Sequence, residues 1–295
     1  MGNQHQFGGS WTSKKLENIQ KYFVAYTTIF KSNPKARYFK TIYIDAFAGT
    51  GYRKPSGEDT DSIFLPIFSD DEVQSFYEGS VKLALDTSPR FDKYIFIEQD
   101  IDRFEELKKI KKEYPAFSKD IFIKNEDANA YLKKICEVVD WKKHRAVIFL
   151  DPYGMQVDWN TIKKIADTKA IDMWLLFPLG VAVNRLLRRD GRLSVNITNR
   201  LNKIFGSEDW KEAFYKEEEI ESLFGKENQI VKVGDFAKIS NYFVNRLKTI
   251  FAGVAEKPLP LYNSRNNPLY LLCFAAANEK GAKPAIKIAN YILRN

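Results

Sequence analysis

Histidine and cysteine are scarce in this chain. Its 295 residues include two of each, namely His5, His144, Cys136 and Cys273. The cysteines have no metal-ligand spacing, and two histidines are too few to argue for a histidine-rich metal centre or a Ser-His-Asp triad. We therefore expect no metal site. So little cysteine is also typical of a reducing compartment, so we expect a cytoplasmic protein.

Long apolar runs are missing as well. No stretch approaches the roughly 20 residues that a helix needs to span a bilayer. The longest run, Leu269 to Ala277, has the length of a β-strand. We therefore expect no membrane segment. The hydrophobic content of 44% still suffices for a sizeable core, which excludes a disordered chain and favours a packed body.

Short apolar runs alternate with helical patterns through the first two thirds of the chain. They lie at about 41–45, 93–98, 120–124, 146–150 and 171–177. This alternation predicts βαβ units and a parallel sheet.

Two further runs near the C-terminus predict how the sheet ends. Phe251 to Tyr262 and Pro268 to Ala277 are separated by a polar turn and resemble an antiparallel pair. A final helix from Lys283 to Leu293 would cover the sheet. We therefore expect an α/β protein with a Rossmann-like, seven-stranded, mostly parallel sheet, an antiparallel closing strand and a helical insertion.

The expected organisation follows from these elements. Ser13 is a good N-cap for the first helix, so the residues before it form a flexible tail. The predicted parts are the tail at 1–12, a core at 13–184 with an insertion at about 52–77, a basic and mainly helical insertion at 185–250, and the rest of the core at 251–295.

The first predicted strand ends in a motif that suits a nucleotide-like cofactor. Asp45-Ala46-Phe47-Ala48-Gly49-Thr50-Gly51 places a carboxylate four positions before a Gly-x-Gly turn. Glycines let the backbone approach a ligand closely, and the carboxylate can attract the amino group of S-adenosylmethionine. We take Asp45, Phe47, Gly49 and Gly51 as candidate cofactor-binding residues. A plain tight turn is an equal interpretation of this motif alone.

Acidic residues also follow the second and third predicted strands. Glu98 is placed to accept hydrogen bonds from both hydroxyl groups of a ribose, because ligands of such folds lie outside the carboxyl ends of the strands. Asp127 could accept a hydrogen bond from an adenine amino group. An N-cap of the next helix is an equal interpretation for Asp127.

The fourth predicted strand ends at Asp151-Pro152-Tyr153-Gly154, which is the candidate catalytic site. Proline blocks further strand pairing, so Asp151 and nearby carbonyl groups can accept hydrogen bonds, while Tyr153 offers a flat face for stacking. Such acceptors would hold an exocyclic amine in line with a methyl group. An ordinary Pro-x-Gly turn is the alternative, which we rank below a catalytic site formed by Asp151, Pro152 and Tyr153.

Positive charge is concentrated after the fifth strand. The chain carries a formal net charge of +8, and six basic residues against one acidic residue lie between Arg185 and Lys203. This stretch should overhang the same edge as Asp151, where it would attract phosphates. A solvated helix face is the alternative. The candidate nucleic-acid-binding residues are Arg185, Arg188, Arg189 and Arg192.

Two longer strings carry a resemblance to a known family. Phe149 to Trp159 reads FLDPYGMQVDW, and Phe177 to Leu187 reads FPLGVAVNRLL. Together with the motif series, they resemble the three-Cys-motif partner proteins, TcmP, from about Lys14 to the C-terminal helix. The resemblance implies a class I methyltransferase-like fold that binds S-adenosylmethionine, and a partner protein bearing a cysteine triplet typical of radical S-adenosylmethionine enzymes. It implies no particular substrate.

Better-understood enzymes of the fold match the fourth site only in part. Adenine and cytosine amino-methyltransferases carry Asp/Asn-Pro-Pro-Tyr or Phe, and this chain lacks the second proline. Asp151 to Gly154 is closer to the Asp-Pro-Phe-Gly of the tRNA guanine-N2 dimethyltransferases.

The sequence therefore favours an S-adenosylmethionine-dependent N-methyltransferase acting on an exocyclic amine of RNA or DNA. The missing second proline favours the alternative, a non-catalytic accessory subunit of the cysteine-triplet protein. A nicotinamide dehydrogenase is disfavoured, because Gly49-Thr50-Gly51-Tyr52-Arg53-Lys54 lacks the third glycine of Gly-x-Gly-x-x-Gly.

Overall fold

The computed structural model describes residues 10–48, 79–152, 154–222, 225–263 and 266–294. The insertion expected at about 52–77 and the first nine residues of the expected tail lie outside these ranges. None of the helices in the described ranges is both long and apolar enough to cross a membrane.

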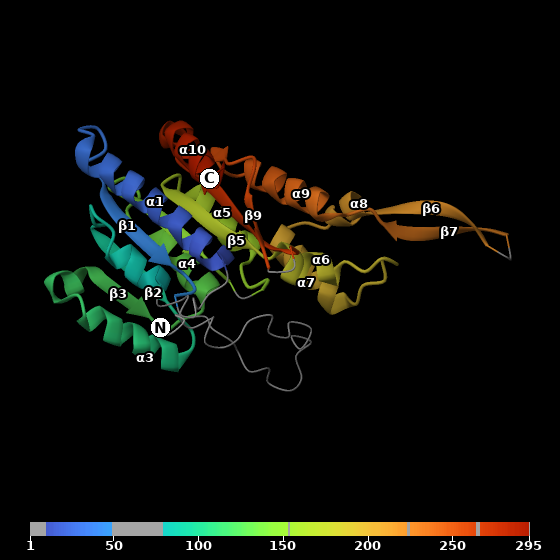
Figure 1. Cartoon of the computed structure of the whole chain (residues 1–295), viewed down its shortest axis with the longest axis horizontal. Helices are drawn as coiled ribbons and strands as arrows, with labels where there is room; N and C mark the ends of the chain where they lie inside the picture. Colours follow the sequence, from blue (N-terminus) through green and yellow to red (C-terminus); the bar gives the residue numbers. More distant parts are fainter. Residues whose placement is uncertain (1–9, 49–78, 153, 223–224, 264–265, 295) are drawn as a thin grey trace, which may run out of the picture.

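One large mixed sheet forms the centre of the molecule, and a separate two-stranded sheet projects from it (Figure 1). The strands of the large sheet are β1 (Lys40–Asp45), β2 (Lys93–Ile97), β3 (Ile121–Lys124), β4 (His144–Leu150), β5 (Ile171–Phe177), β8 (Gly253–Val254), β9 (Leu259–Tyr262) and β10 (Pro268–Ala276). The small sheet consists of β6 (Tyr215–Ser222) and β7 (Gly225–Lys232).

The strand order confirms the expected fold class. The main path runs β3-β2-β1-β4-β5-β10-β8, with β1 to β5 parallel and β10 antiparallel to β5. In the first five positions this is the doubly wound order, in which the chain reverses direction across the sheet between β1 and β4. The protein has a Rossmann-like methyltransferase fold, and its ligand-binding edge is expected at the carboxyl ends of β1, β2 and β4.

The last position of the sheet is shared by two short strands. β8 pairs with β10 at Ala275 and Ala276, whereas β9 pairs with the earlier part of β10, from Pro268 to Leu272. Both use the edge of β10 that faces away from β5, so β8 and β9 are one interrupted strand. This confirms the antiparallel closing pair and gives the expected seven positions.

Helices cover both faces of the sheet. They are α1 (Ser10–Ser32), α3 (Ile101–Lys112), α4 (Ala128–Val138), α5 (Trp159–Asp167), α6 (Asn184–Leu186), α7 (Val195–Phe205), α8 (Trp210–Phe214), α9 (Phe236–Lys248) and α10 (Glu279–Arg294), with short helical turns η2 (Pro115–Asp120) and η3 (Leu179–Val183). A further helical segment spans 79–85.

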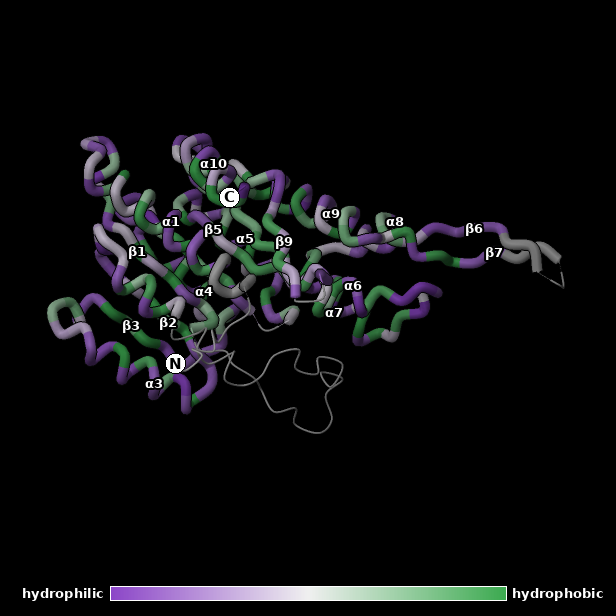
Figure 2. Tube along the Cα trace, viewed as in Figure 1, coloured by the Kyte–Doolittle hydropathy of each residue, from purple (hydrophilic) through white to green (hydrophobic). Residues whose placement is uncertain are grey.

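Alternation along the strands divides the core into two layers. In β4, Ile148 faces a cluster that includes residues of α4, α5, α7, α8 and α9, whereas Phe149 faces a second cluster with residues of α1, α3 and α10. Both side chains are almost fully buried. Figure 2 shows the contrast between this apolar centre and the hydrophilic β6 of the projecting hairpin. An unbroken apolar strand is therefore required at β4, because both of its faces are covered.

Two expectations about the helices are wrong. The first helix begins at Ser10, three residues before the expected cap at Ser13. The region 185–250 is not mainly helical, because 215–232 forms the β6–β7 hairpin, in register from Tyr215–Lys232 to Ser222–Gly225. Glu and Lys favour helices locally, but cross-strand pairing decides the conformation here.

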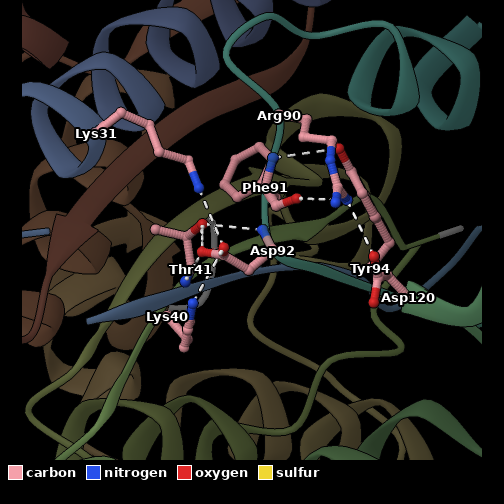
Figure 3. Close-up of polar contacts among 8 residues, drawn as sticks. All are labelled: Lys31, Lys40, Thr41, Arg90, Phe91, Asp92, Tyr94 and Asp120. Atoms are coloured by element: carbon pink, nitrogen blue, oxygen red, sulfur yellow. Dashed lines mark hydrogen bonds and ion pairs between the residues drawn. The ribbon is translucent and has the colours of Figure 1, made fainter. Parts of the chain in front are cut away.

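The opposite, amino edge of the sheet is held by a polar cluster at Asp92 (Figure 3). Asp92 Oδ2 accepts hydrogen bonds from the backbone N and Oγ1 of Thr41, each at 2.8 Å, and Oδ1 accepts one from Lys31 Nζ at 3.1 Å. Although partial burial opposes ionisation, these hydrogen bonds lower the pKa of Asp92. The cluster ties α1 and β1 to β2, and it lies away from the edge where ligands bind.

Candidate active site

Three buried carboxylates lie at the carboxyl edge of the sheet. Asp45 is the last residue of β1, Glu98 directly follows β2, and Asp151 directly follows β4. Their relative exposures are 1%, 2% and 5%. Because β1 lies between β2 and β4, the three side chains come from neighbouring strands. Burying this much negative charge is costly unless each group is paired or serves a ligand.

Asp45 is held by three donors. Its Oδ2 accepts hydrogen bonds from Tyr43 Oη at 3.2 Å and Ser80 Oγ at 3.3 Å, and its Oδ1 accepts one from the backbone N of Phe47 at 3.3 Å. Burial, followed by repulsion from Asp151, outweighs these contacts and raises the pKa of Asp45 to about 7. Asp45 therefore changes charge near neutral pH, where an approaching cation would favour its ionised form.

The chain after β1 turns between the ends of the neighbouring strands. Ala46 N donates to Phe149 O of β4 over 3.3 Å, and Ala48 N donates to Ile97 O of β2 over 3.0 Å. Phe47, one of the candidate cofactor residues, is 6% exposed. The turn expected here is confirmed as far as residue 48. Gly49 and Gly51, the glycines of the motif, lie outside the described residues.

Glu98 has one committed and one uncommitted carboxylate oxygen among the described residues. Its Oε1 accepts a hydrogen bond from Asp100 N at 2.7 Å, whereas its Oε2 is buried and has no hydrogen-bond partner in the described part of the chain. Burial raises the pKa of Glu98, and the Asp100 N–H opposes this increase. The structure commits Oε1 to the backbone and leaves Oε2 for a donor beyond the described residues. A ribose hydroxyl is a donor of the right kind.

Asp127 is exposed and caps α4. Its Oδ1 accepts a hydrogen bond from Ala130 N at 2.9 Å, which confirms the interpretation as an N-cap. The adenine contact stays a prediction for this residue. The neighbouring Asn125 donates from Nδ2 to the carbonyl groups of Glu98 and Gln99, each at 2.9 Å, and so joins the loops that follow β2 and β3.

Asp151 makes an ion pair that sequence reasoning missed. Lys15 Nζ of α1 lies 2.8 Å from Asp151 Oδ2, with side-chain exposures of 1% and 6%. Burial lowers the pKa of Lys15, while attraction to Asp151 and, more weakly, to Asp45 opposes that decrease. The amine acceptor expected at Asp151 is therefore shared with a buried cation from the first helix.

The chain bends at Gly154, soon after Asp151. Pro152 is buried, and Gly154 has a φ of 70°, a conformation that favours glycine. This backbone conformation is compatible with a Pro-x-Gly turn, and both the turn and the catalytic role stay predictions. Tyr153 lies outside the described residues. Asn129 fixes the next stretch by accepting hydrogen bonds from Asp158 N at 3.0 Å and Thr161 Oγ1 at 2.8 Å.

The four candidate arginines all lie exposed, between β5 and the projecting hairpin. The backbone carbonyl of Arg188 accepts a hydrogen bond from Tyr215 Oη at 3.0 Å, and that of Arg189 accepts one from Lys232 N at 3.1 Å. The basic stretch therefore anchors the base of the hairpin. The Arg188 side chain also approaches Asp190, with Nε 3.5 Å from Oδ1. Arg185 and Arg192 are exposed in the same stretch.

Two residues of the site were missed for the same reason. Lys15 and Ser80 lie 136 and 35 positions from the carboxylates that they contact. Lys15 follows Lys14 near the start of an amphipathic helix, where a lysine normally faces water. Its position beside Leu16, at the start of the apolar stripe of α1, was the only signal in the sequence, and it was too weak to separate Lys15 from its neighbours.

Comparison with known proteins gives distant structural likenesses. A protein of Legionella pneumophila has 12% identity and a TM-score of 0.47, covering 98% of this chain and 92% of its own. A candidate S-adenosylmethionine-dependent methyltransferase of Listeria monocytogenes has 8% identity and a TM-score of 0.37, covering 87% and 97%. A candidate methyltransferase of Escherichia coli has 11% identity and a TM-score of 0.30, covering 72% and 85%.

Neither a family model nor a curated protein matches the chain. Membership of the three-Cys-motif partner family therefore stays an expectation. Likenesses at these TM-scores carry no argument about the reaction, and the fold class rests on the strand order. By that order, the chain is a Rossmann-like methyltransferase-fold protein with buried carboxylates at the carboxyl edge of its sheet.

Proposed function

We propose that this protein is an S-adenosylmethionine-dependent N-methyltransferase that acts on an exocyclic amine of an RNA or DNA base. The observation that carries the cofactor half is Glu98 Oε2, a buried carboxylate oxygen with no hydrogen-bond partner in the described ranges. Its place after β2 is where doubly wound folds hold a ribose. A single hydroxyl donor from the ribose would satisfy it.

The other residues of this edge suit the remaining parts of the same cofactor. Asp45, with a pKa of about 7, would become fully ionised beside the ammonium group of the methionine moiety. Phe47 lies in the turn beside it, and Asp127 would accept a hydrogen bond from the adenine amine. Gly49 and Gly51 would let the backbone approach. The bound cofactor would supply an electrophilic methyl group.

The amine half of the proposal rests on Asp151. An aromatic amine is a weak nucleophile, so an acceptor for its protons holds the nitrogen in line and favours the positive charge that develops on it. Asp151 directly follows β4, the strand that pairs with β1, and its charge acts on Asp45 at the end of β1. Pro152 would fix the turn, and Tyr153 would stack on a base taken out of its helix.

The nucleic-acid part of the proposal rests on charge and position. Arg185, Arg188, Arg189 and Arg192 are exposed in the segment that follows β5, the strand next to β4. Cations beside an amine-binding edge would hold the phosphates that flank a target base.

Transfer of a labelled methyl group tests the proposal. The purified protein would be incubated with tritiated S-adenosylmethionine and with separate pools of RNA and DNA, alongside Asp151→Ala. We expect label in one pool with the wild type, and a loss of at least 100-fold in the variant. Nucleoside mass spectrometry of cells with and without the gene would then identify the base. No label in either pool, with S-adenosylmethionine bound, would contradict the proposed reaction.

One feature favours a second candidate function, an accessory subunit of a cysteine-triplet protein. The β6–β7 hairpin projects from the body (Figure 1), and such a hairpin has two edges to which another strand could add. Deletion of 215–232 separates the candidates. Loss of a co-purifying partner, with no methyl transfer by the intact chain, would favour the accessory role.

A further inference from the structure

The Lys15–Asp151 ion pair is too buried to be an ordinary surface contact. Lys15 is one of the largest fully buried side chains in the described part of the molecule, and its Nζ also lies 5.6 Å from the centre of the Phe149 ring. Removing an ammonium group from water is costly, and the attraction of one carboxylate often only offsets that cost. An apolar side chain at this position would serve packing at least as well. Stability alone therefore does not explain a lysine here.

The position of the pair is informative. α1 precedes β1 and runs back along the sheet, so that its Lys15 reaches the carboxyl edge while its Lys31 reaches Asp92 at the amino edge. The cation meets Asp151, the residue that the proposed reaction needs, and its charge also acts on Asp45. Lys15 thus contacts the carboxylate assigned to the amine and is attracted by the carboxylate assigned to the cofactor.

The two oxygens of Asp151 are used unequally. Oδ2 accepts the hydrogen bond from Lys15 Nζ, and Oδ1 accepts none from any residue that the structure describes. A carboxylate held at one oxygen cannot rotate freely, so its other oxygen keeps one direction. This is the arrangement that a directed acceptor requires.

We propose that Lys15 is a positioning residue for methyl transfer, holding Asp151 by Oδ2 so that Oδ1 accepts the proton of the reacting amine. This inference rests on the proposed function. The amine nitrogen forms a bond to the methyl carbon, the carbon–sulfur bond breaks, and its electron pair stays on sulfur. The proton that the nitrogen loses passes to Asp151 Oδ1 and then to water. Lys15 acts through Asp151 and not directly on the substrate or the cofactor.

A double-mutant cycle at these two residues tests the inference. The proteins are the wild type, Lys15→Met, Asp151→Asn and Lys15→Met/Asp151→Asn, each assayed for kcat with labelled S-adenosylmethionine and the accepted nucleic acid. We expect Lys15→Met to lower kcat at least 30-fold and to change the Kd for S-adenosylmethionine less than threefold by calorimetry. In the Asp151→Asn background the same change should cost less than threefold, because Lys15 acts through the Asp151 carboxylate.

A matched control and a spectroscopic measurement accompany the cycle. Lys21→Met removes an exposed lysine of the same helix, which pairs with Glu17, and should leave kcat unchanged. In the wild type, the ¹⁵Nζ signal of Lys15 should be protected from exchange with water, and Asp151→Asn should shift it. The exchange and shift of the Lys15 signal are measured without turnover, so this readout is independent of the kinetic cycle.

Two results would overturn the inference. The first is that the wild type transfers methyl groups and the kcat of Lys15→Met lies within threefold of the wild-type kcat. The other is a further loss of more than tenfold when Lys15→Met is added to Asp151→Asn, since a lysine that only docks α1 would impair both backgrounds alike. If Lys15→Met alone does not fold, this second comparison decides, because the double variant buries no unpaired charge. If the wild type transfers no methyl group, the proposed function itself is contradicted, and this outcome is distinct from a failure of the inference about Lys15.

Discussion

Ser80 Oγ lies 3.3 Å from Asp45 Oδ2 and joins the helical segment at 79–85 to the end of β1. The contact brings a hydroxyl group from the far side of a long insertion to the carboxylate that begins the cofactor motif. It does not overcome burial, and the pKa of Asp45 still rises from 3.8 to about 7.

The pH dependence of stability should report this pKa. The folded state holds the Asp45 proton more tightly than the unfolded state, so stability falls as pH rises from about 4 to about 7 and is level above. The loss is up to about 4 kcal/mol, at about 1.4 kcal/mol for each pH unit. The gain in the free energy of unfolding of Asp45→Asn over the wild type should therefore be larger at pH 8 than at pH 5. Urea unfolding of both proteins at both pH values measures this gain.

Asp172 offers a comparison for that measurement. Burial raises its pKa to about 7 as well, against the hydrogen bond from Tyr22 and the charge of Arg145. Asp172→Asn should therefore also reduce the slope of unfolding free energy against pH, independently of Asp45→Asn. If Asp45→Asn has the same slope of unfolding free energy against pH as the wild type, a raised pKa at Asp45 is contradicted.

Removal of the buried cation at Lys15 should cost stability. Lys15→Met leaves the Asp151 carboxylate buried and unpaired, and we expect a loss of about 3–5 kcal/mol in the free energy of unfolding. Lys15→Met/Asp151→Asn should lose less, because no charge is left unpaired. Lys21→Met, at an exposed pair, should stay within about 1 kcal/mol of the wild type. Equal losses in the single and double variants would argue against an ion pair in solution.

The exposed arginines should contribute to nucleic-acid affinity through phosphates. Arg188→Ala/Arg189→Ala should weaken the binding of a single-stranded oligonucleotide, and should reduce the slope of log K against log salt by about 0.7 for each phosphate that the variant no longer neutralises. Fluorescence anisotropy at several salt concentrations measures both quantities. The control is Lys283→Ala/Lys287→Ala, which removes the same charge from exposed positions on α10. If the two double variants have equal slopes of log K against log salt, the nucleic acid does not bind at Arg188 and Arg189.

The sequence predicted the sheet and its acidic edge because both depend on local patterns. β1 to β5 are apolar runs of strand length, and Asp45, Glu98 and Asp151 stand directly at their ends. The parallel order then brings the three carboxylates to one edge. No contact between distant residues was needed for this part of the prediction.

What was missed depends on distant contacts. The sequence predicted a mainly helical insertion at 185–250. Within it, 215–232 instead forms a hairpin, which is held by pairing between β6 and β7 and by the carbonyl groups of Arg188 and Arg189. Likewise, a lysine in α1 gives no local sign of being buried against Asp151. Glu98 was placed correctly, but the use of its Oε1 by Asp100 follows from the loop conformation, which the sequence pattern did not specify.

The most direct measurement of the central claim is calorimetric binding of S-adenosylmethionine to the wild type and to Glu98→Gln. Glutamine keeps an acceptor for Asp100 N and the shape of the side chain, but it removes the charge that Oε2 would offer a ribose hydroxyl. A charged hydrogen bond of this kind contributes about 1.5–3 kcal/mol, so we predict saturable binding by the wild type and a Kd raised about 10- to 100-fold in the variant. Glu105→Gln, in an exposed pair with Lys108, should bind as the wild type does. No binding by the wild type, or equal binding by Glu98→Gln, would contradict the account.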